Sequence, residues 1–177
     1  MNKKYFLCSF IVSTVVLFCT SFVANEVVNQ DQDYISKYPS INPKEFHKER
    51  NFVVVIISSD CPGAPSFMPI LKKNIELLKK QGFKYYVVND NSISEASDLN
   101  LTKCLTKYDL NETAYFIDSK EYPETGGFIN AKKRYKNFVH DIIPNPEQPF
   151  WGYAYYIIYK DGKYYKDTYE FKAEYLM

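Results

Sequence analysis

The feature that most constrains the fold is the run FVVVII at Phe52–Ile57. A continuous stretch of β-branched and aromatic residues is typical of a strand that is buried on both faces. Such a strand lies at the centre of a sheet that helices cover on both sides, so the chain is expected to be α/β. With 177 residues, 46% of them hydrophobic, the chain is long enough for one well-packed domain.

Patterns of apolar residues divide the rest of the chain into further elements. Recurrence at three- and four-residue spacing predicts helices over residues 66–81, 94–108 and 132–143. Short apolar segments predict strands over residues 83–88 and 113–117. Residues 153–169 predict a β-hairpin, whose turn is the Asp161-Gly162 pair. This order predicts an α/β sandwich with a mixed central sheet, flanking helices and a C-terminal β-hairpin.

The first 24 residues have the composition of a targeting segment. Lys3 and Lys4 form a basic start, and an apolar run follows from Tyr5 to Ala24. This pattern is typical of a signal peptide or an N-terminal membrane anchor, and the run is long enough for either. Residues 25–43 are polar and are expected to be a linker, so the folded domain is expected over residues 44–177. The protein is therefore expected to be exported, to a periplasmic or membrane-associated location in the cell envelope.

Four cysteines divide between the targeting segment and the domain. Cys19 raises the question of a lipoprotein, but the preceding Phe18 fits a lipidation motif poorly. Removal of residues 1–24 takes away Cys8, Cys19 and two lysines, and the formal net charge changes from +1 to −1. Cys61 and Cys104 remain. In an exported protein they either form a disulfide, or one is a reactive thiol and the other a core residue.

The charge balance and the motifs exclude several classes of function. A formal net charge of +1, without a basic stripe of interleaved aromatic residues, argues against nucleic-acid binding. The sequence has no Cys/His spacing of a metal site and no phosphate-binding loop, so neither a metal nor a cofactor is expected. The chemistry is therefore expected to come from a side chain of the chain itself.

Cys61 is the strongest candidate for that side chain. The buried strand leads into CPGAPSFMP at residues 61–69, so the thiol is expected at the start of a helix. Free backbone N–H groups and the positive end of the helix dipole favour a thiolate there, whereas the neighbouring Asp60 carboxylate disfavours it. Pro62 suits the first helical position, and Gly63 allows a partner to approach closely. Cys61 is therefore predicted to be the nucleophile of a thiol site.

The segment resembles the active-site region of the thioredoxin superfamily, which consists of a strand, a Cys-x-x-Cys motif and a helix that carries a proline. Pro69 stands eight residues after Cys61, where that helix is kinked. The stretches LKKNIELLKKQGFKYYVVND and LTKYDLNETAYFID resemble the exported, membrane-linked branch of thiol–disulfide oxidoreductases (TlpA-like). The resemblance implies a thioredoxin-like sandwich and thiol–disulfide chemistry at Cys61.

The chain departs from the family pattern at three places. Ala64 stands where the family has its second active-site cysteine, which leaves a CxxA motif, and Asp60 stands where a tryptophan is usual. The family's cis-proline, which faces the active site and opens a strand, falls near Glu112 or near Ala154. Neither residue is proline.

Two functions agree with these residues. In the first, Cys61 carries out thiol–disulfide exchange with proteins or small thiols, and Cys104 or an external thiol resolves the mixed disulfide. Cys104 lies on an apolar helical stripe, so it is also a candidate core cysteine. In the second, the thioredoxin fold survives as a catalytically degenerate binding or scaffolding domain of the cell envelope, and Cys61 is a remnant. Whether the chain is an enzyme is left open, as is a membrane tether through residues 1–24.

Overall fold

The computed structural model describes residues 34–110, 114–123, 128–143, 145–146 and 153–177. The chain divides into two units, residues 1–35 and Ser36–Met177, and every helix and strand described below lies in the second. The predicted targeting segment and most of the predicted linker lie outside the described residues. No helix formed by the described residues combines the length and the apolarity needed to cross a membrane.

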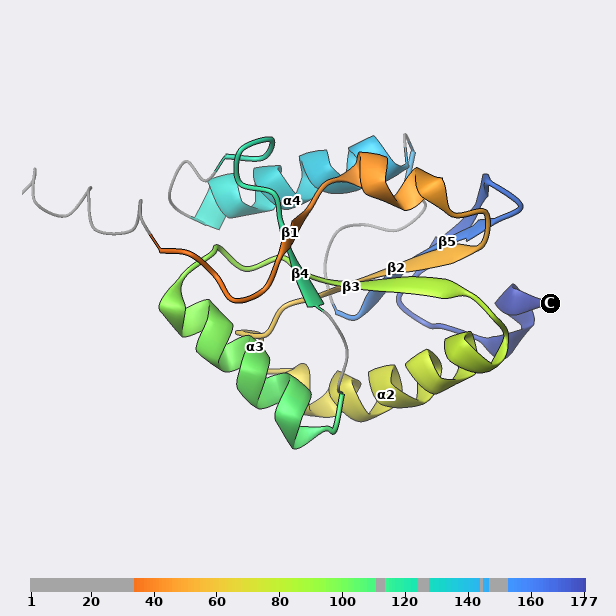
Figure 1. Cartoon of the computed structure of the whole chain (residues 1–177), viewed down its shortest axis with the longest axis horizontal. Helices are drawn as coiled ribbons and strands as arrows, with labels where there is room; N and C mark the ends of the chain where they lie inside the picture. Colours follow the sequence, from red (N-terminus) through yellow and green to blue (C-terminus); the bar gives the residue numbers. More distant parts are fainter. Residues whose placement is uncertain (1–33, 111–113, 124–127, 144, 147–152) are drawn as a thin grey trace, which may run out of the picture. The chain divides into compact units, whose positions relative to one another are not determined.

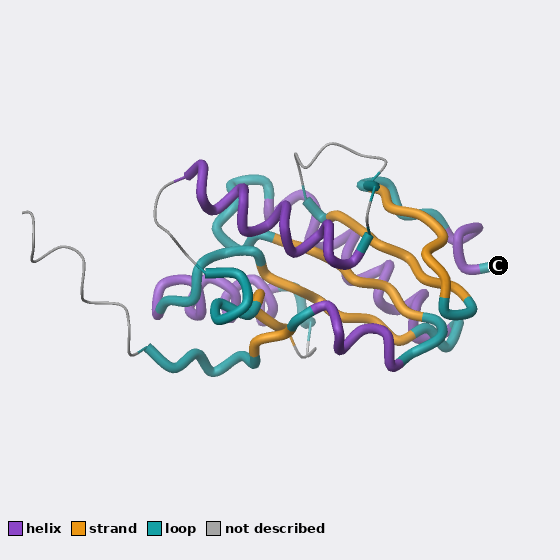
Figure 2. The backbone as a smooth tube through the Cα atoms, turned by 90° about the horizontal axis from the view of Figure 1, so that it is seen from above, coloured by secondary structure: helices purple, strands orange, loops and turns teal. Residues whose placement is uncertain are grey.

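A six-stranded mixed sheet, built by the described residues, forms the centre of the second unit. Its strands, in spatial order, are β1 (Ser40–Ile41), β4 (Ala114–Ile117), β3 (Lys84–Asn89), β2 (Phe52–Ile57), β5 (Tyr155–Lys160) and β6 (Lys163–Thr168). The first four strands are parallel to one another, β5 is antiparallel to β2, and β6 is antiparallel to β5. Figure 2 shows these strands side by side between helices. The prediction of a mixed sheet with a C-terminal hairpin is confirmed.

Strand β2 lies at the centre of the sheet, as the sequence predicts. All six of its side chains are buried. Val53, Val55 and Ile57 pack in one hydrophobic cluster, and the alternate residues pack in a second cluster on the other face. Because successive side chains of a strand point to opposite faces, only a run without polar positions can serve both clusters.

Helices cover both faces of the sheet (Figure 1). Helices α2 (Ala64–Lys80) and α3 (Glu95–Lys107) cover one face, and α4 (Phe128–Ile142) covers the other, next to the 3-10 helix η1 (Pro43–Lys48). A second 3-10 helix, η2 (Ala173–Leu176), lies near the C-terminus. This arrangement is the thioredoxin-like α/β sandwich that the sequence predicts.

Helix and turn boundaries follow local sequence signals. The Ser94 side chain caps α3 by accepting a hydrogen bond from the Ser97 backbone N–H. Gly82 and Gly162 have φ angles of 72° and 75°, which glycine adopts without strain, and they end α2 and form the hairpin turn. Helix α4 begins four residues before the predicted start, because its backbone hydrogen bonding extends beyond the apolar stripe that located it.

The sheet also includes residues that the sequence places in the linker. Strand β1 pairs with β4, and Ile41 is buried. The following Asn42 caps η1, in which Phe46 is fully buried. The folded unit therefore begins before residue 44. A two-residue strand is too short to show the alternation by which strands are recognised, so the sequence gives no sign of it.

Candidate functional site

Cys61 lies in the turn that joins β2 to α2. Its N–H donates to the Ser58 carbonyl at 3.2 Å, and the Ala64 N–H donates to the Cys61 carbonyl at 2.9 Å. The helix begins at Ala64 with Gly63 as its N-cap residue. The prediction that Pro62 takes the first helical position is therefore wrong: Pro62 lies in the turn, and the proline of the first helical turn is Pro65. The thiol is half-buried and free.

Gly63 supplies a direct contact to the Cys61 sulfur. Its backbone N–H donates to Sγ, with 3.4 Å between nitrogen and sulfur. A hydrogen bond to sulfur stabilises negative charge that develops there. A Cβ atom at position 63 would lie 3.5 Å from Sγ, an ordinary contact distance. Residue 63 therefore borders the space that the sulfur occupies.

Ala64 and Pro69 lie in α2, just after the turn. The Ala64 side chain is 4% exposed, so the position of the family's second cysteine holds a buried methyl group. Pro69 lies inside the helix and has no N–H to donate to the Pro65 carbonyl one turn earlier. That carbonyl accepts a hydrogen bond from the Tyr108 hydroxyl at 3.4 Å.

Two asparagines, Asn89 at the buried end of β3 and Asn91 just after it, hold the turn from the neighbouring strand. Asn89 Oδ1 accepts from the Ser59 N–H at 2.9 Å, and Asn89 Nδ2 donates to Ser59 Oγ at 3.1 Å. Asn91 Oδ1 accepts from Ser58 Oγ at 3.2 Å and from Ser59 Oγ at 3.1 Å. The residues leading to Cys61 are thus fixed by side chains for which the sequence analysis predicted no role.

Cys104, the candidate resolving thiol, lies on the other side of the same turn. Its thiol donates to the Ser59 carbonyl, with Sγ 3.7 Å from the oxygen. Helix α3 also contacts the turn through Asn100, which donates to Asp60 Oδ1 at 2.8 Å. Burial, together with the Asp60 carboxylate, raises the pKa of the Cys104 thiol. Cys104 is therefore near the site but is held in the protonated, less nucleophilic form.

A carboxyl group and a tyrosine lie beside the turn. The Tyr153 hydroxyl donates to Asp90 Oδ2. Burial raises the pKa of Asp90 from 3.8 to about 6, while the Tyr153 hydrogen bond and the Arg134 charge limit the rise. Burial and the Asp90 charge raise the pKa of Tyr153, and the Cys61 sulfur contributes to that rise. Neither residue was identified from the sequence as a site residue.

Ala154 is one of the two positions that the sequence offers for the family's cis-proline. It directly precedes β5, which pairs with β2, and the Tyr153–Ala154 peptide bond is cis. The Tyr153 ring contacts Phe67 of α2, with 6.5 Å between ring centroids. The other position, Glu112, lies outside the described residues.

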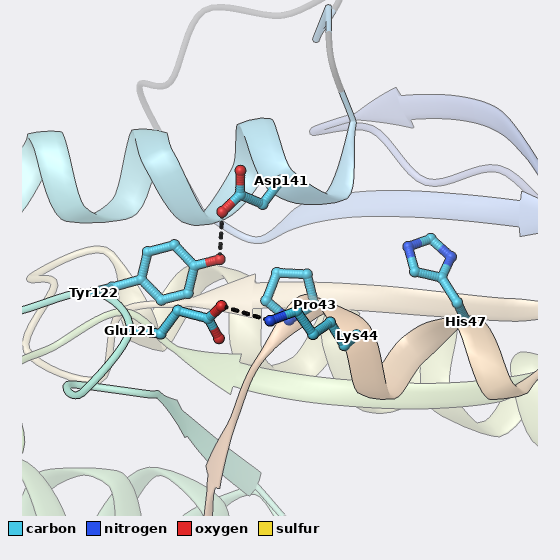
Figure 3. Close-up of a pocket in the computed structure, with 6 residues that line it drawn as sticks. All are labelled: Pro43, Lys44, His47, Glu121, Tyr122 and Asp141. Carbon is cyan, nitrogen blue, oxygen red and sulfur yellow. Dashed lines mark hydrogen bonds and ion pairs between the residues drawn. The ribbon is translucent and has the colours of Figure 1, made fainter.

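A separate hollow of about 210 Å³ lies between η1, the loop after β4 and α4 (Figure 3). Its polar groups pair with one another: Lys44 Nζ lies 3.0 Å from Glu121 Oε1, and the Tyr122 hydroxyl donates to Asp141 at 2.6 Å. In Figure 3, His47 lies apart from both pairs. Because the lysine, the tyrosine and both carboxylates of this hollow are paired and none of its side chains is a thiol, the Cys61 turn is the stronger candidate.

Comparison with known proteins finds similar solved structures but no assigned family. No protein-family model matches the chain, and no curated protein matches it. The chain is similar to the thioredoxin domain of a thiol-disulfide oxidoreductase from Bacteroides vulgatus, at 16% identity over 75% of this chain and 77% of that one, with a TM-score of 0.46.

Two further structures are similar at the same level. A secreted Mycobacterium tuberculosis disulfide oxidoreductase homologous to E. coli DsbE has 14% identity over 72% of this chain and 77% of that one, with a TM-score of 0.42. A thiol:disulfide interchange protein from Bacteroides sp. has 15% identity over 79% and 86%, with a TM-score of 0.46. Likeness at these identities and TM-scores says nothing about what this chain acts on.

The topology and the position of the thiol define the class of the protein. A mixed sheet lies between helices on both faces, and Cys61 lies in the turn that joins the central strand β2 to helix α2. The described residues therefore form a thioredoxin-like α/β fold, with one cysteine in the turn before α2.

Proposed function

We propose that the chain is an exported thioredoxin-like protein that uses the single thiol of Cys61 in thiol–disulfide exchange with proteins or small thiols. The observation that carries this proposal is the presentation of Cys61. The thiol stands in a turn that Asn89 and Asn91 fix from the next strand, and the Gly63 N–H is directed at its sulfur. A purely structural cysteine needs neither feature.

The exchange step uses the Cys61 sulfur as nucleophile. Its thiolate attacks one sulfur of a disulfide R–S–S–R′, a bond forms between Cys61 and that sulfur, and R′–S⁻ leaves with the electron pair of the broken bond. Pro62 and Gly63 shape the turn that presents the sulfur, and Pro69 interrupts the hydrogen bonding of the first turns of α2. The product is a mixed disulfide on Cys61.

Resolution of this mixed disulfide needs a second thiol, which Ala64 does not supply. Cys104 is near, but burial raises the pKa of its thiol and disfavours the attacking thiolate. An external thiol is therefore the expected resolving partner, and Cys104 a secondary one. Such a cycle suits isomerisation or the transfer of a disulfide between partners.

The proposed export rests on the sequence of residues 1–24, with Lys3 and Lys4 before an apolar run. The same residues would provide a membrane tether if they are retained. Both statements concern residues outside the described part of the chain.

The test is an isomerase assay on a model protein with scrambled disulfides, in a reduced and oxidised glutathione buffer. The wild-type protein is expected to accelerate recovery of native disulfides, and Cys61→Ser is expected to abolish the effect. Cys104→Ser is the matched control and is expected to keep most of the activity, because glutathione resolves the adduct. Equal activity of wild type and Cys61→Ser would contradict the proposal.

Ala64 supports a second candidate, a binding or scaffolding domain without chemistry, because a self-contained dithiol cycle is impossible with it. This candidate predicts that the wild-type protein forms no mixed disulfide with oxidised glutathione, even above pH 8. The exchange function predicts an adduct of glutathione mass on the peptide that contains Cys61. Mass spectrometry of the digested protein distinguishes the two.

A further inference from the structure

Asp60, the residue directly before Cys61, places a negative charge next to the thiol. Its side chain is exposed, whereas Ser58 and Ser59 before it are buried. Because consecutive Cα atoms are about 3.8 Å apart, the carboxylate of one residue lies within roughly 10 Å of the sulfur of the next in any rotamer. That separation is about one Debye length at roughly 0.1 M salt, so a group bound at the sulfur interacts with the charge.

Helix α3 and the loop after β3 hold Asp60 in place. Asn100 Nδ2 of α3 donates to Asp60 Oδ1 at 2.8 Å, and Ser59 Oγ lies 3.5 Å from the same oxygen. The Asp60 N–H donates to Asn91 Oδ1 at 3.3 Å. Both the main chain and the side chain of Asp60 are therefore anchored, and the carboxylate stays beside the thiol.

The partners of Asp60 are neutral, so they leave its charge uncompensated. Asp60 forms no ion pair with any residue that the structure describes. The sequence from Phe52 to Leu71, which contains the whole turn, has no other charged residue. The segment that presents Cys61 therefore carries one negative charge and no positive charge.

The neighbouring Cys104 thiol shows which charge dominates near the turn. Cys104 Sγ lies 3.7 Å from the Ser59 carbonyl oxygen, so it responds to the charges around the turn. Burial raises the pKa of Cys104 most, Asp60 raises it further, and Lys107 lowers it by a smaller amount. The effect of Asp60 thus exceeds that of the nearby lysine.

The other charged pair at this edge of the sheet compensates itself. Arg134 Nη1 donates to the Asp90 carbonyl at 3.4 Å, and its positive charge favours the ionised Asp90 carboxylate. Arg134 is 4% exposed. Because these two charges are opposite in sign, Asp60 is the charge that a substrate meets at the Cys61 turn.

We propose that Asp60 is a specificity-determining residue, and that the substrates of Cys61 are disulfides with positive charge beside their sulfur atoms, such as protein disulfides flanked by lysine or arginine. A carboxylate at this position opposes negative charge on the sulfur and so disfavours general reactivity. Attraction of a cationic substrate offsets that loss. This inference rests on the exchange function proposed above and names its substrate class.

The charge acts on the step that forms the mixed disulfide. The Cys61 thiolate, whose proton has gone to solvent, attacks one sulfur of R–S–S–R′ and forms a new S–S bond. R′–S⁻ leaves with the electron pair of the broken bond and takes up a proton from solvent. A positive group on R or R′ is attracted to Asp60 during this step, whereas a negative group is repelled.

The test compares three small disulfides that differ in charge. Cystamine is the cation, bis(2-hydroxyethyl) disulfide the neutral reference and 3,3′-dithiodipropionate the anion. Each reacts at pH 7 and low salt with the full chain carrying Cys104→Ser, and mass spectrometry after an acid quench measures the adduct on the peptide that contains Cys61. The readout is the rate constant for cystamine divided by that for dithiodipropionate. The neutral disulfide reports any change in the general reactivity of the thiol.

Two variants and a control assign the selectivity to Asp60. Asp60→Asn keeps an acceptor for Asn100 and is expected to lower the ratio about tenfold, since one charge at this range changes each rate by about threefold. Asp60→Lys is expected to lower it further. Asp161→Asn, in an exposed turn with φ of 52° that asparagine tolerates, removes the same charge about 20 Å away, beyond the other end of β2, and is expected to leave the ratio unchanged.

The outcomes separate this inference from the function on which it rests. An equal ratio in wild type and Asp60→Asn overturns the role of Asp60 and leaves the exchange function standing. If neither variant folds, the wild-type ratio is compared with that of N-acetylcysteine amide, a thiol without a charged neighbour, and a ratio no higher than that of the model thiol overturns the role. Absence of an adduct on Cys61 with all three disulfides overturns both.

Discussion

Asn89 shows how much the site depends on a side chain that performs no chemistry. It is fully buried, and its amide makes two hydrogen bonds to Ser59, two residues before Cys61. An asparagine in the last position of a buried strand would be costly without such partners. The residue is therefore best understood as the anchor of the Cys61 turn.

Replacement of Asn89 by alanine is expected to lower the free energy of unfolding by about 1–3 kcal/mol, because the buried Ser59 N–H loses its acceptor. Urea denaturation measures this change. Asn100→Ala is the matched control, since Asn100 makes its hydrogen bond to Asp60 at an exposed position. A loss as large in the control as in Asn89→Ala would contradict the assignment.

Asp90 is expected to make stability depend on pH. Its pKa is raised to about 6 in the folded protein, so the folded state binds the proton more tightly than the unfolded state. The resulting stabilisation is present below about pH 4 and is lost as the pH rises through about 6. Relative to wild type, Asp90→Asn should therefore gain about 2 kcal/mol between pH 4 and pH 7, a value reduced for partial exposure.

Urea unfolding of both proteins at the two pH values measures this gain. A difference between them that is constant with pH would show that the pKa of Asp90 is not raised in the folded protein.

At the scale of elements, the segment that leads into β1 is held by α3, while β1 itself pairs with β4. Ser36 Oγ donates to Asp98 Oδ1 at 2.7 Å, and the Lys37 N–H donates to Oδ2 at 2.9 Å. Asp98 is 3% exposed and lies in the first turn of α3. A polar segment that the sequence assigns to a linker is thus fixed by a long-range contact, which no local pattern predicts.

Loss of these hydrogen bonds to Asp98 is expected to let the segment that leads into β1 detach from α3. Asp98→Ala should lower the free energy of unfolding by about 2 kcal/mol, as expected for hydrogen bonds to a charged acceptor. Limited proteolysis should then cleave near residues 36–41 faster than in wild type. Glu95→Ala, at an exposed position of the same helical turn, is the control, and equal cleavage in the two variants would contradict the prediction.

The turn from Cys61 to Ala64 retains the geometry of a two-cysteine site. The Ala64 N–H donates to the Cys61 carbonyl, as in a β-turn, whose end Cα atoms lie within about 7 Å. A disulfide spans such a distance. Ala64→Cys is therefore expected to form a disulfide with Cys61 and to resolve the mixed disulfide without an external thiol.

This prediction is checked by mass spectrometry after reaction with 5,5′-dithiobis(2-nitrobenzoate), in protein that also carries Cys104→Ser. The parent should retain the adduct on Cys61, whereas the Ala64→Cys protein should lose it and form an intramolecular disulfide. Adducts on both thiols of the variant would show that the turn does not bring the sulfurs together.

For the whole molecule, the sandwich could be predicted because its signals are local. The apolar run of β2, the helical stripes and the Asp161-Gly162 turn each identify an element within its own segment. Within the site, only Cys61 could be predicted, because its signal also lies within one segment of the sequence. Asp90 and Tyr153 join it from separate strand ends through the register of β2 with β3 and β5, which local patterns do not contain. The one available signal was the polar sequence after β3, at the edge where parallel sheets bind ligands.

The central claim is that the fold presents Cys61 as a single reactive thiol. The Cys104 thiol, in contrast, is hydrogen-bonded to the Ser59 carbonyl and stays protonated. The most direct measurement is the rate at which iodoacetamide alkylates each cysteine of the native protein at pH 7, followed peptide by peptide by mass spectrometry. Cys61 is expected to react at least about tenfold faster than Cys104, whose pKa is raised by burial. Equal rates, or slower alkylation of Cys61, would contradict the account and favour a scaffold without chemistry.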